Sequence, residues 1–115
     1  MHELSIASSI IETVRGEIAS RPGRRATAVG VRIGALAAID ADALRFGFDA
    51  IVKDSDLEPL RIDIEQIDRR QRCLDCSTEF ETDRYTLTCP ACGSLRGACI
   101  AGEELDITFI EVEEA

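Results

Sequence analysis

The sequence predicts an α+β fold, in which two helices pack on a three-stranded sheet and a zinc-ribbon-like lobe is inserted ahead of the last strand. Two segments repeat apolar residues every three or four positions, and three others alternate apolar with polar residues. Two Cys-x-x-Cys pairs lie between the second and third alternating segments. Amphipathic helices and one-sided strands bury their apolar faces by packing as two layers. The 115 residues suffice for one compact domain with a small lobe, and an aromatic content of 4% makes its core aliphatic.

Two helices are predicted from the helical period. The first spans roughly residues 4–20 and ends at the Arg-Pro-Gly turn of residues 21–23. Its apolar face consists of Leu4, Ala7, Ile11, Val14 and Ile18. The second helix begins after Asp40 or Asp42, either of which can cap its amino terminus. Its apolar face consists of Leu44, Phe48, Ile51 and Val52, and Phe46 falls outside that face.

Three strands are predicted from the period of two. The first covers residues 27–33, buries its odd positions and ends at Gly34. The second runs from about residue 60 toward Arg72. In the third, Leu105, Ile107 and Phe109 share one face. Ile110 and Val112 follow out of phase with them, which predicts a register change or bulge near the end of this strand.

Charge and the amino-terminal sequence exclude several classes of protein. The net charge of −9 repels phosphate backbones, so nucleic acid is disfavoured as a partner. The chain has no membrane-spanning apolar run, and its first apolar stretch is interrupted by serines and lacks the basic start of a secretory signal. We therefore expect a cytoplasmic protein with no membrane partner, in which thiols stay reduced and paired cysteines bind metal.

The two cysteine pairs, Cys73 with Cys76 and Cys89 with Cys92, are separated by twelve residues. Each pair lets a tight turn aim two sulfurs at one point, and two such turns complete a tetrahedron around zinc with zinc–sulfur distances of about 2.3 Å. Four thiolates leave no open coordination position, so the predicted zinc site is structural. Disulfides or inert thiols are the alternatives without metal, and iron also suits a cage of four sulfurs. Cys99 is the odd thiol, interpreted as a small buried residue where the two lobes join.

The only histidine of the chain is residue 2. Its imidazole, its backbone nitrogen and the amine of Met1 can bind one ion through small chelate rings, and three such nitrogens favour the square-planar geometry of nickel(II) and copper(II). Residue chemistry alone leaves plainer interpretations open. His2 can be an ordinary exposed terminal residue, Glu3 a favourable acid in the first turn of a helix, and Asp40 an N-cap.

Several segments together resemble a known family. They are Met1-His2-Glu3, the Val-Arg-Ile-Gly-Ala-Leu run of residues 31–36, the Ala-Leu-Arg-Phe run of residues 43–46, Phe48-Asp49 and the two cysteine pairs. The combination resembles the HypA/HybF family of nickel-insertion accessory proteins for [NiFe]-hydrogenase, and the resemblance covers nearly the whole chain. Its most specific part is the Met-His-Glu start combined with the zinc pattern. Cys99 is not part of the family motif.

The resemblance implies a metallochaperone that carries Ni²⁺ as transient cargo and catalyses nothing. His2 is then the principal nickel ligand, and Met1, Glu3 and Asp40 are neighbours that bind or tune the ion. The family's structural Zn²⁺ falls on Cys73, Cys76, Cys89 and Cys92. The predicted domains are a nickel-binding domain of residues 1–72 with 100–115 and a zinc-binding domain of residues 73–99. The implied partners are a nickel-handling maturation GTPase and the hydrogenase large subunit, with urease maturation in some organisms.

Other classes of function stay as alternatives. A zinc-ribbon adaptor would recognise a protein or a nucleic acid without a second metal, and the charge of −9 opposes its nucleic-acid version. A rubredoxin-like electron carrier would need iron in the sulfur cage. An enzyme is the weakest interpretation, because the sequence holds no Gly-rich phosphate loop and no nucleophile with a recognisable base.

Overall fold

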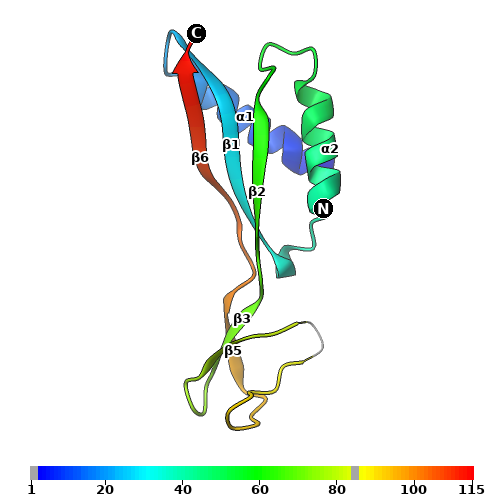
Figure 1. The fold of residues 1–115 in the computed structure, drawn as a ribbon, viewed down its shortest axis with the longest axis vertical. Coiled ribbons are helices and arrows are strands. Elements are labelled where there is room, and N and C mark those ends of the chain that lie inside the picture. Colours follow the sequence, from blue (N-terminus) through cyan, green and yellow to red (C-terminus); the bar gives the residue numbers. More distant parts are fainter. Residues whose placement is uncertain (1–2, 84–85) are drawn as a thin grey trace. The chain divides into compact units, whose positions relative to one another are not determined.

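The computed structural model describes residues 3–83 and 86–115. These residues form two α-helices, six strands and one short 3-10 helix, and Figure 1 shows how they are arranged. In chain order they are α1 (Glu3–Ala19), β1 (Arg24–Gly34), the 3-10 helix η1 (Ala35–Ala37), α2 (Ala41–Val52), β2 (Arg61–Ile67), β3 (Arg70–Cys73), β4 (Glu79–Glu81), β5 (Gly97–Ala101) and β6 (Leu105–Glu114). The strands form two three-stranded sheets, β2-β1-β6 and β4-β3-β5. The predicted α+β class, with two helices, a three-stranded sheet and a lobe that carries the cysteines, is confirmed.

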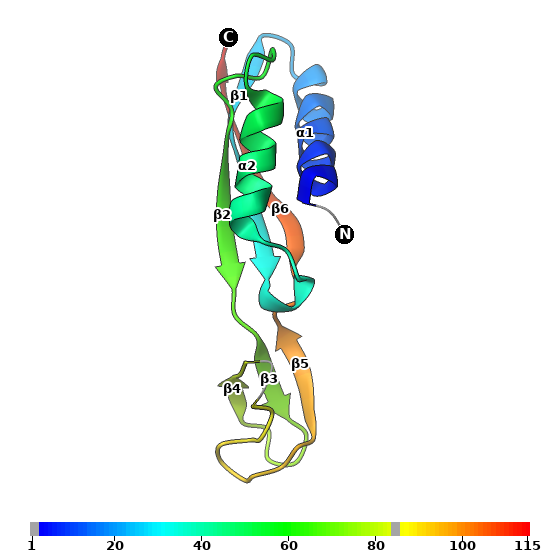
Figure 2. The ribbon, with the colours of Figure 1, turned by 90° about the vertical axis from the view of Figure 1, so that its right-hand side faces the viewer.

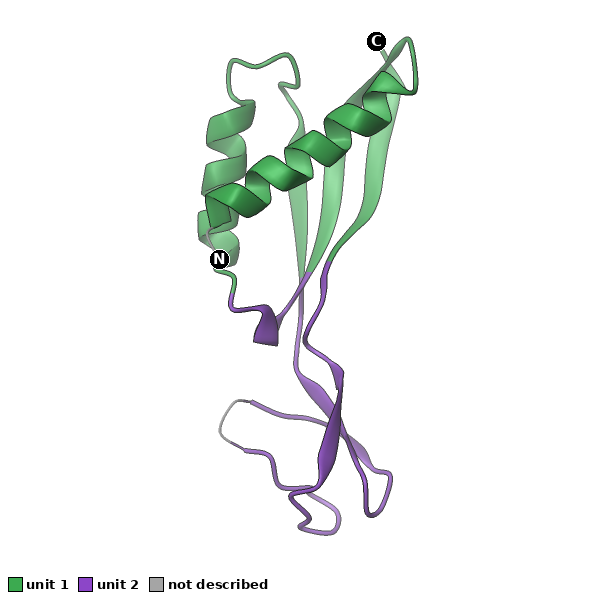
Figure 3. Ribbon diagram, turned by 180° about the vertical axis from the view of Figure 1, so that it is seen from behind, with its two compact units in different colours: residues 1–32, 39–65, 106–115 green, residues 33–38, 66–105 purple. Residues whose placement is uncertain are grey.

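The chain divides into two compact units, which Figure 3 colours separately. Unit 1 contains residues 1–32, 39–65 and 106–115, and unit 2 contains residues 33–38 and 66–105. The limits expected for the zinc-binding domain, residues 73–99, stay a prediction. Within residues 3–83 and 86–115, neither helix is long and apolar enough to cross a membrane.

Unit 1 consists of a mixed sheet with both helices on one of its faces, as Figures 2 and 3 show. Strand β6 runs antiparallel to β1, because Ala115 N donates to Gly23 O at 2.9 Å and Thr27 Oγ1 donates to Glu111 O at 3.2 Å. Strands β1 and β2 are joined through α2, and their arrowheads point the same way in Figure 2. The central strand β1 thus has a parallel neighbour on one side and an antiparallel neighbour on the other.

The core of unit 1 lies between the helices and the sheet. The buried apolar residues of unit 1 as a whole are Ile6, Ala7, Ile10, Ile11, Val14, Ala26, Ala28, Val29, Val31, Leu44, Phe48, Val52, Leu60 and Ile62. The face of α1 predicted from the sequence is partly wrong, since Ile6 and Ile10 are buried while Leu4 is 57% exposed. Helix α1 packs against both α2 and the sheet, so its buried face is wider than a single stripe. Phe46 is 77% exposed on α2, as its position outside the apolar face predicted.

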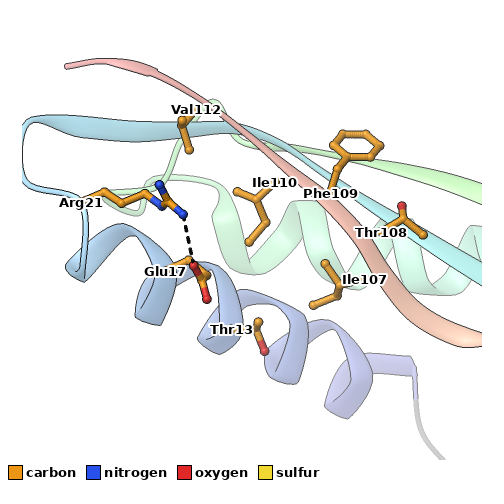
Figure 4. Close-up of a pocket in the computed structure, with 8 residues that line it drawn as sticks. All are labelled: Thr13, Glu17, Arg21, Ile107, Thr108, Phe109, Ile110 and Val112. Carbon is orange, nitrogen blue, oxygen red and sulfur yellow. Dashed lines mark ion pairs between the residues drawn. The ribbon is translucent and has the colours of Figure 1, made fainter.

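Strand β6 changes the alternation of its side chains as the sequence predicted. Ile107, Ile110 and Val112 are half-buried, and the residues between them are exposed. Phe109 was expected to share the face of Ile107, and this is wrong. Its ring lies over Gly30, where an added Cβ would come within 2.0 Å of it, and Figure 4 shows the ring pointing away from α1. The absence of a side chain at Gly30 gives the ring its place on that face of the sheet.

Unit 2 is built around an antiparallel sheet in which β3 pairs with β4 and β5. The single strand expected from residue 60 to Arg72 is in fact two strands, because β2 pairs with β1 whereas β3 pairs within unit 2. Arg69 lies between the two, and its carbonyl accepts a hydrogen bond from Thr82 N at 3.0 Å. The buried cluster of unit 2 consists of Cys73, Phe80 and Cys89. Two of its three members are thiols, so apolar burial alone contributes little to the stability of this unit.

Candidate metal sites

The cysteine pairs lie on two turns with the same pattern of backbone hydrogen bonds. In the first turn Ser77 N donates to Cys73 O at 2.9 Å, and in the second Gly93 N donates to Cys89 O at 2.9 Å. Ser77 and Gly93 both have a positive φ, 67° and 77°. A backbone N–H also points at the first sulfur of each turn, from Asp75 and from Ala91, at 3.4 Å in both. Gly93 takes this left-handed conformation at no steric cost, because glycine has no side chain.

The two turns bring their four sulfurs to one point. Cys73 Sγ lies 3.6 Å from Cys92 Sγ, and Cys76 Sγ lies 3.6 Å from Cys89 Sγ. All four sulfurs lie within 4.8 Å of one another. A tetrahedron with zinc–sulfur bonds of about 2.3 Å has sulfur–sulfur edges of about 3.8 Å. The four side chains therefore fit a tetrahedral ion bound by sulfur, and all four cysteines are free of disulfides.

The surroundings of the sulfurs favour thiolate at some positions and thiol at others. The Thr78 hydroxyl, 3.2 Å from Cys76 Sγ, and the Thr78 backbone N–H lower the pKa of Cys76 to about 6. The Ser94 backbone N–H lowers the pKa of Cys92, but hydrogen bonds to the neighbouring thiols of Cys73 and Cys76 outweigh it and raise that pKa to about 12. Without a metal ion the cluster is thus a mixture of thiolate and thiol that shares protons. A bound divalent cation displaces those protons and makes all four sulfurs ligands.

Cys99 does not join this cluster. It lies on β5 with its thiol exposed, and its Sγ donates to Ala101 O at 3.2 Å. The expectation of a buried residue is therefore wrong. Strand β5 has an almost entirely exposed burial pattern, which single-sequence patterns of alternation do not reveal.

The second candidate site begins where the described chain begins. Met1 and His2 lie outside the described residues, and Glu3 is the first residue of α1. Asp40 is the N-cap of α2, and its Oδ1 accepts the N–H groups of Asp42 at 2.9 Å and Ala43 at 3.1 Å. Of the two acids that could cap this helix, Asp40 does so.

The fold brings Glu3 and Asp40 together. Glu3 Oε2 accepts the backbone N–H of Asp40 at 3.3 Å, although the residues are far apart in sequence. Both acids thus keep the helical roles that residue chemistry allows, a first-turn acid and an N-cap. The carboxylate of Glu3 thus contacts the backbone of Asp40, while the carboxylate of Asp40 is used by the first turn of α2.

A cavity of about 420 Å³ opens between α1 and β6 in unit 1 (Figure 4). It is lined by Thr13, Glu17 and Arg21 of α1 and by Ile107, Thr108, Phe109, Ile110 and Val112 of β6. Ile107 and Ile110 point toward the helix in Figure 4. The lining contains no thiol or imidazole, so this cavity does not have the donor set of a transition-metal site. The sequence signal for it is the change of phase along β6.

Comparison with known proteins identifies the family. The sequence profile described as hydrogenase/urease nickel incorporation, metallochaperone, matches residues 1–112. Hydrogenase maturation factor HypA of Geotalea uraniireducens is 40% identical over 113 residues, which are 98% of this chain and 100% of that protein. HypA of Chlorobium luteolum is 40% identical over 114 residues, which are 99% of this chain and 97% of that protein.

The fold is also that of solved HypA structures. The solution structure of the Ni metallochaperone HypA from Helicobacter pylori covers all of both chains with a TM-score of 0.65 at 24% identity. Another HypA solution structure has a TM-score of 0.69 at 25% identity and covers 96% of this chain and 95% of the other. The four-cysteine cluster further indicates a metal bound for structure. The chain therefore belongs to the HypA family of nickel metallochaperones for hydrogenase maturation, whose members are not enzymes.

Proposed function

We propose that this chain binds Ni²⁺ at its amino terminus and delivers it for maturation of [NiFe]-hydrogenase, and of urease where the host makes that enzyme. The observation that carries the proposal is that the family likeness begins at residue 1, so that it includes Met1-His2-Glu3. A carrier must bind its ion weakly enough to release it. A chain terminus with small chelate rings suits that need better than a closed cage does.

The proposed ligand set is the amine of Met1 with the backbone nitrogen and imidazole of His2. These three nitrogens close two small rings and favour the square-planar geometry that nickel(II) adopts. Glu3 and Asp40 are proposed as acids that bind or tune the ion. The hydrogen bond of 3.3 Å between Glu3 Oε2 and Asp40 N supports this, because it brings Asp40 beside Glu3, which follows His2 directly in the sequence.

Structural zinc is proposed at Cys73, Cys76, Cys89 and Cys92. When bound, zinc links two turns that no disulfide joins, and it gives unit 2 a core that its apolar residues do not provide. The sulfur–sulfur distances of 3.6 Å support this assignment. The same cage suits iron, so metal analysis and colour distinguish the two, since zinc thiolates are colourless and iron thiolates are red.

The proposed partners are a nickel-handling GTPase and the hydrogenase large subunit. The sequence contains no phosphate-binding loop, so any nucleotide energy for delivery comes from a partner. The first helix and its neighbourhood are proposed as the contact surface. Leu4, the second residue of α1, and Phe46 on α2 support this, because both are large apolar side chains exposed in unit 1.

Nickel titration by calorimetry tests the amino-terminal site. The untagged protein is compared with His2→Ala, with a form that carries one extra residue before Met1, and with a carboxy-terminally tagged form. Specific nickel binding should be lost in His2→Ala and in the form with an extra residue, and kept in the carboxy-terminally tagged form. The zinc content should be the same in all four proteins. Binding should weaken as pH falls through about 6.5, because a protonated imidazole has no lone pair for the ion. Equal affinity in all four proteins would leave a zinc-ribbon adaptor as the better interpretation.

A pair of substitutions at Asp40 separates capping from nickel binding. Asparagine caps a helix about as well as aspartate, whereas alanine costs about 1 kcal/mol. Asp40→Asn should therefore keep thermal stability and weaken nickel binding, and Asp40→Ala should lower both. If Asp40→Asn binds nickel as the native chain does, the carboxylate serves only the helix.

A further inference from the structure

The two cysteine turns have the same backbone geometry but differ in the residue before their second cysteine. Both form the same backbone bonds to their first cysteine, yet the second residue between the cysteines is Asp75 in the first turn and Ala91 in the second. Because Ala91 completes its turn without a carboxyl group, the carboxylate of Asp75 is not needed to form the turn itself. Its contacts indicate another role.

The Asp75 carboxylate reaches across to the segment that follows the second turn. Ser94 Oγ donates to Asp75 Oδ2, and Arg96 Nη1 donates to Asp75 Oδ1 at 2.7 Å. Ser94 Oγ in turn accepts the backbone N–H of Arg96 at 3.0 Å, which fixes the direction in which its hydroxyl donates. A backbone bond runs alongside, from Leu74 N to Arg96 O at 2.8 Å. Both carboxylate oxygens are therefore used to connect the two turns.

The hydroxyl groups of Thr78 and Ser94 also differ in the groups that they contact. Thr78 and Ser94 occupy equivalent positions, since Cys73 N donates to Thr78 O at 2.8 Å and Cys89 N donates to Ser94 O at 2.9 Å. The Thr78 hydroxyl faces a sulfur of its own turn, at 3.2 Å from Cys76 Sγ. The Ser94 hydroxyl instead donates to the opposite turn. One hydroxyl thus tunes a ligand and the other holds the two pairs of ligands together.

We propose that Asp75, with Ser94 and Arg96, is a positioning residue that clamps the two cysteine turns together and slows the loss of the metal. The inference rests on the four-cysteine metal site proposed above. The metal leaves as its thiolate ligands dissociate one after another, and separation of the two turns makes each dissociation harder to reverse. The clamp resists that separation without touching the ion.

The expected change in the rate of zinc release depends on whether Asp75 acts through its charge or by orienting the two turns. The side chains of Asp75 and Arg96 are 40% and 71% exposed, so an isolated ion pair here would contribute little. The contribution comes from orientation, because residues that hold metal ligands in place typically change metal affinity by about 10–100-fold. We expect Asp75→Ala to release zinc about tenfold faster than the native protein. Asp75→Asn keeps a carbonyl oxygen for Ser94 but loses the charge that pairs with Arg96, so its rate should lie between the two.

The experiment measures zinc transfer from the full chain to an excess of a chromophoric chelator. Glu79→Ala is the matched control, since it breaks an exposed ion pair of the same unit, Arg72 Nη2 to Glu79 Oε2 at 3.2 Å, that joins adjacent strands and not the two turns. Its release rate should equal that of the native protein. Added salt should speed release from the native protein and from Glu79→Ala but not from Asp75→Ala, because only the first two keep the clamp's ion pair.

Further readouts distinguish the clamp from a merely structural role. The thiolate absorption bands of cobalt-substituted protein should be the same in all variants, since the four sulfur ligands are unchanged. Ser94→Ala combined with Asp75→Ala should release zinc no faster than Asp75→Ala alone. Release from Asp75→Ala at the native rate, or an equal acceleration in Glu79→Ala, overturns the clamp. Native protein that contains no zinc overturns the metal site itself, so the two failures are distinct.

Discussion

The chemistry of individual side chains is most marked around the four sulfurs. The hydroxyl and the backbone N–H of Thr78 both interact with the sulfur of Cys76 and lower the pKa of Cys76 to about 6. The thiols around Cys92 raise its pKa to about 12. Two cysteines of one cage thus differ in protonation at neutral pH before any metal binds. Cys76 is the thiolate available for the first contact with an ion, because the thiolate is the form that binds metal.

This difference predicts the reactivity of the zinc-free protein. Cys76 should be alkylated at neutral pH, and its rate should fall as pH falls through about 6, because the thiolate is protonated there. Thr78→Val removes the hydroxyl and should move this midpoint up toward the ordinary thiol value of about 8.5. Mass spectrometry of peptides after brief alkylation at several pH values measures each cysteine. The exposed Cys99 serves as an internal reference for reagent access. A Cys76 rate that keeps rising from pH 7 to pH 9 would contradict the assignment.

At the scale of elements, the sequence was informative where a pattern is local and long. Both helices, β1 and the phase change in β6 follow from periodicity, and the cysteine cluster follows from spacing. The three-residue strand β4 and the exposed strand β5 have too little pattern to be predicted. Close approaches between side chains and neighbouring strands also leave no pattern in the sequence. The ring of Phe109 over Gly30 depends on a partner strand distant in sequence, so no local signal reveals it.

Gly34 gives a prediction at this scale. Its φ of −81° suits any residue, so space alone requires glycine there. An added Cβ would lie 2.1 Å from the carbonyl carbon and oxygen of Gly102, where Gly34 N donates to Glu104 O and Leu36 N donates to Gly102 O. Gly34→Ala should therefore lower the free energy of unfolding by about 1–3 kcal/mol.

Gly16→Ala is the matched control for that substitution. Gly16 lies inside α1 with nothing within 4 Å of an added Cβ, so alanine there should stabilise by about 0.5–1 kcal/mol. Calorimetry of the zinc-loaded proteins measures both changes. A native melting temperature for Gly34→Ala would mean that the backbones of Gly34 and Gly102 can separate at no cost.

At the scale of the whole molecule, Phe46 and Leu95 are the most exposed large apolar side chains among the described residues. Phe46 in unit 1 and Leu95 in unit 2 are similarly exposed, 77% and 74%. If the neighbourhood of the first helix binds the nickel-handling GTPase, Phe46→Ser should weaken that complex by at least about tenfold, since aromatic anchors carry much of the energy of an interface. Leu95→Ser should leave it unchanged. Anisotropy titration with the purified GTPase measures both, and equal effects would exclude a specific contact at Phe46.

The division into two units also explains which part of the site the sequence could predict. Two short Cys-x-x-Cys motifs specify the four sulfur donors, so these donors could be predicted without knowledge of the fold. The approach of Glu3 to Asp40 depends on how α1 packs against the start of α2, and it follows from no motif. Spacing thus predicts side chains that converge on tight turns, whereas the approach of Glu3 to Asp40 results from packing and needs the structure.

Removal of zinc should destabilise unit 2 and leave the stability of unit 1 nearly unchanged. In the described part of the chain, both α-helices belong to unit 1, so the helical circular dichroism signal reports on that unit alone. Its core is aliphatic apart from Phe48 and contains none of the four cysteines, whereas the buried cluster of unit 2 includes Cys73 and Cys89. Stripping zinc with a chelator should therefore lower the hydrogen-exchange protection of β3, β4 and β5 and leave most of the helical signal.

Two cysteine substitutions complete this test. Cys73→Ser should reproduce the effect of the chelator, because one missing sulfur opens the cage. Cys99→Ser should keep both zinc and protection, because the thiol of Cys99 is exposed and lies outside the cluster. Hydrogen exchange followed by mass spectrometry resolves the two units. Loss of the helical signal together with the protection of β3 would show that the two units fold as one cooperative body, and the zinc would then stabilise unit 1 as well.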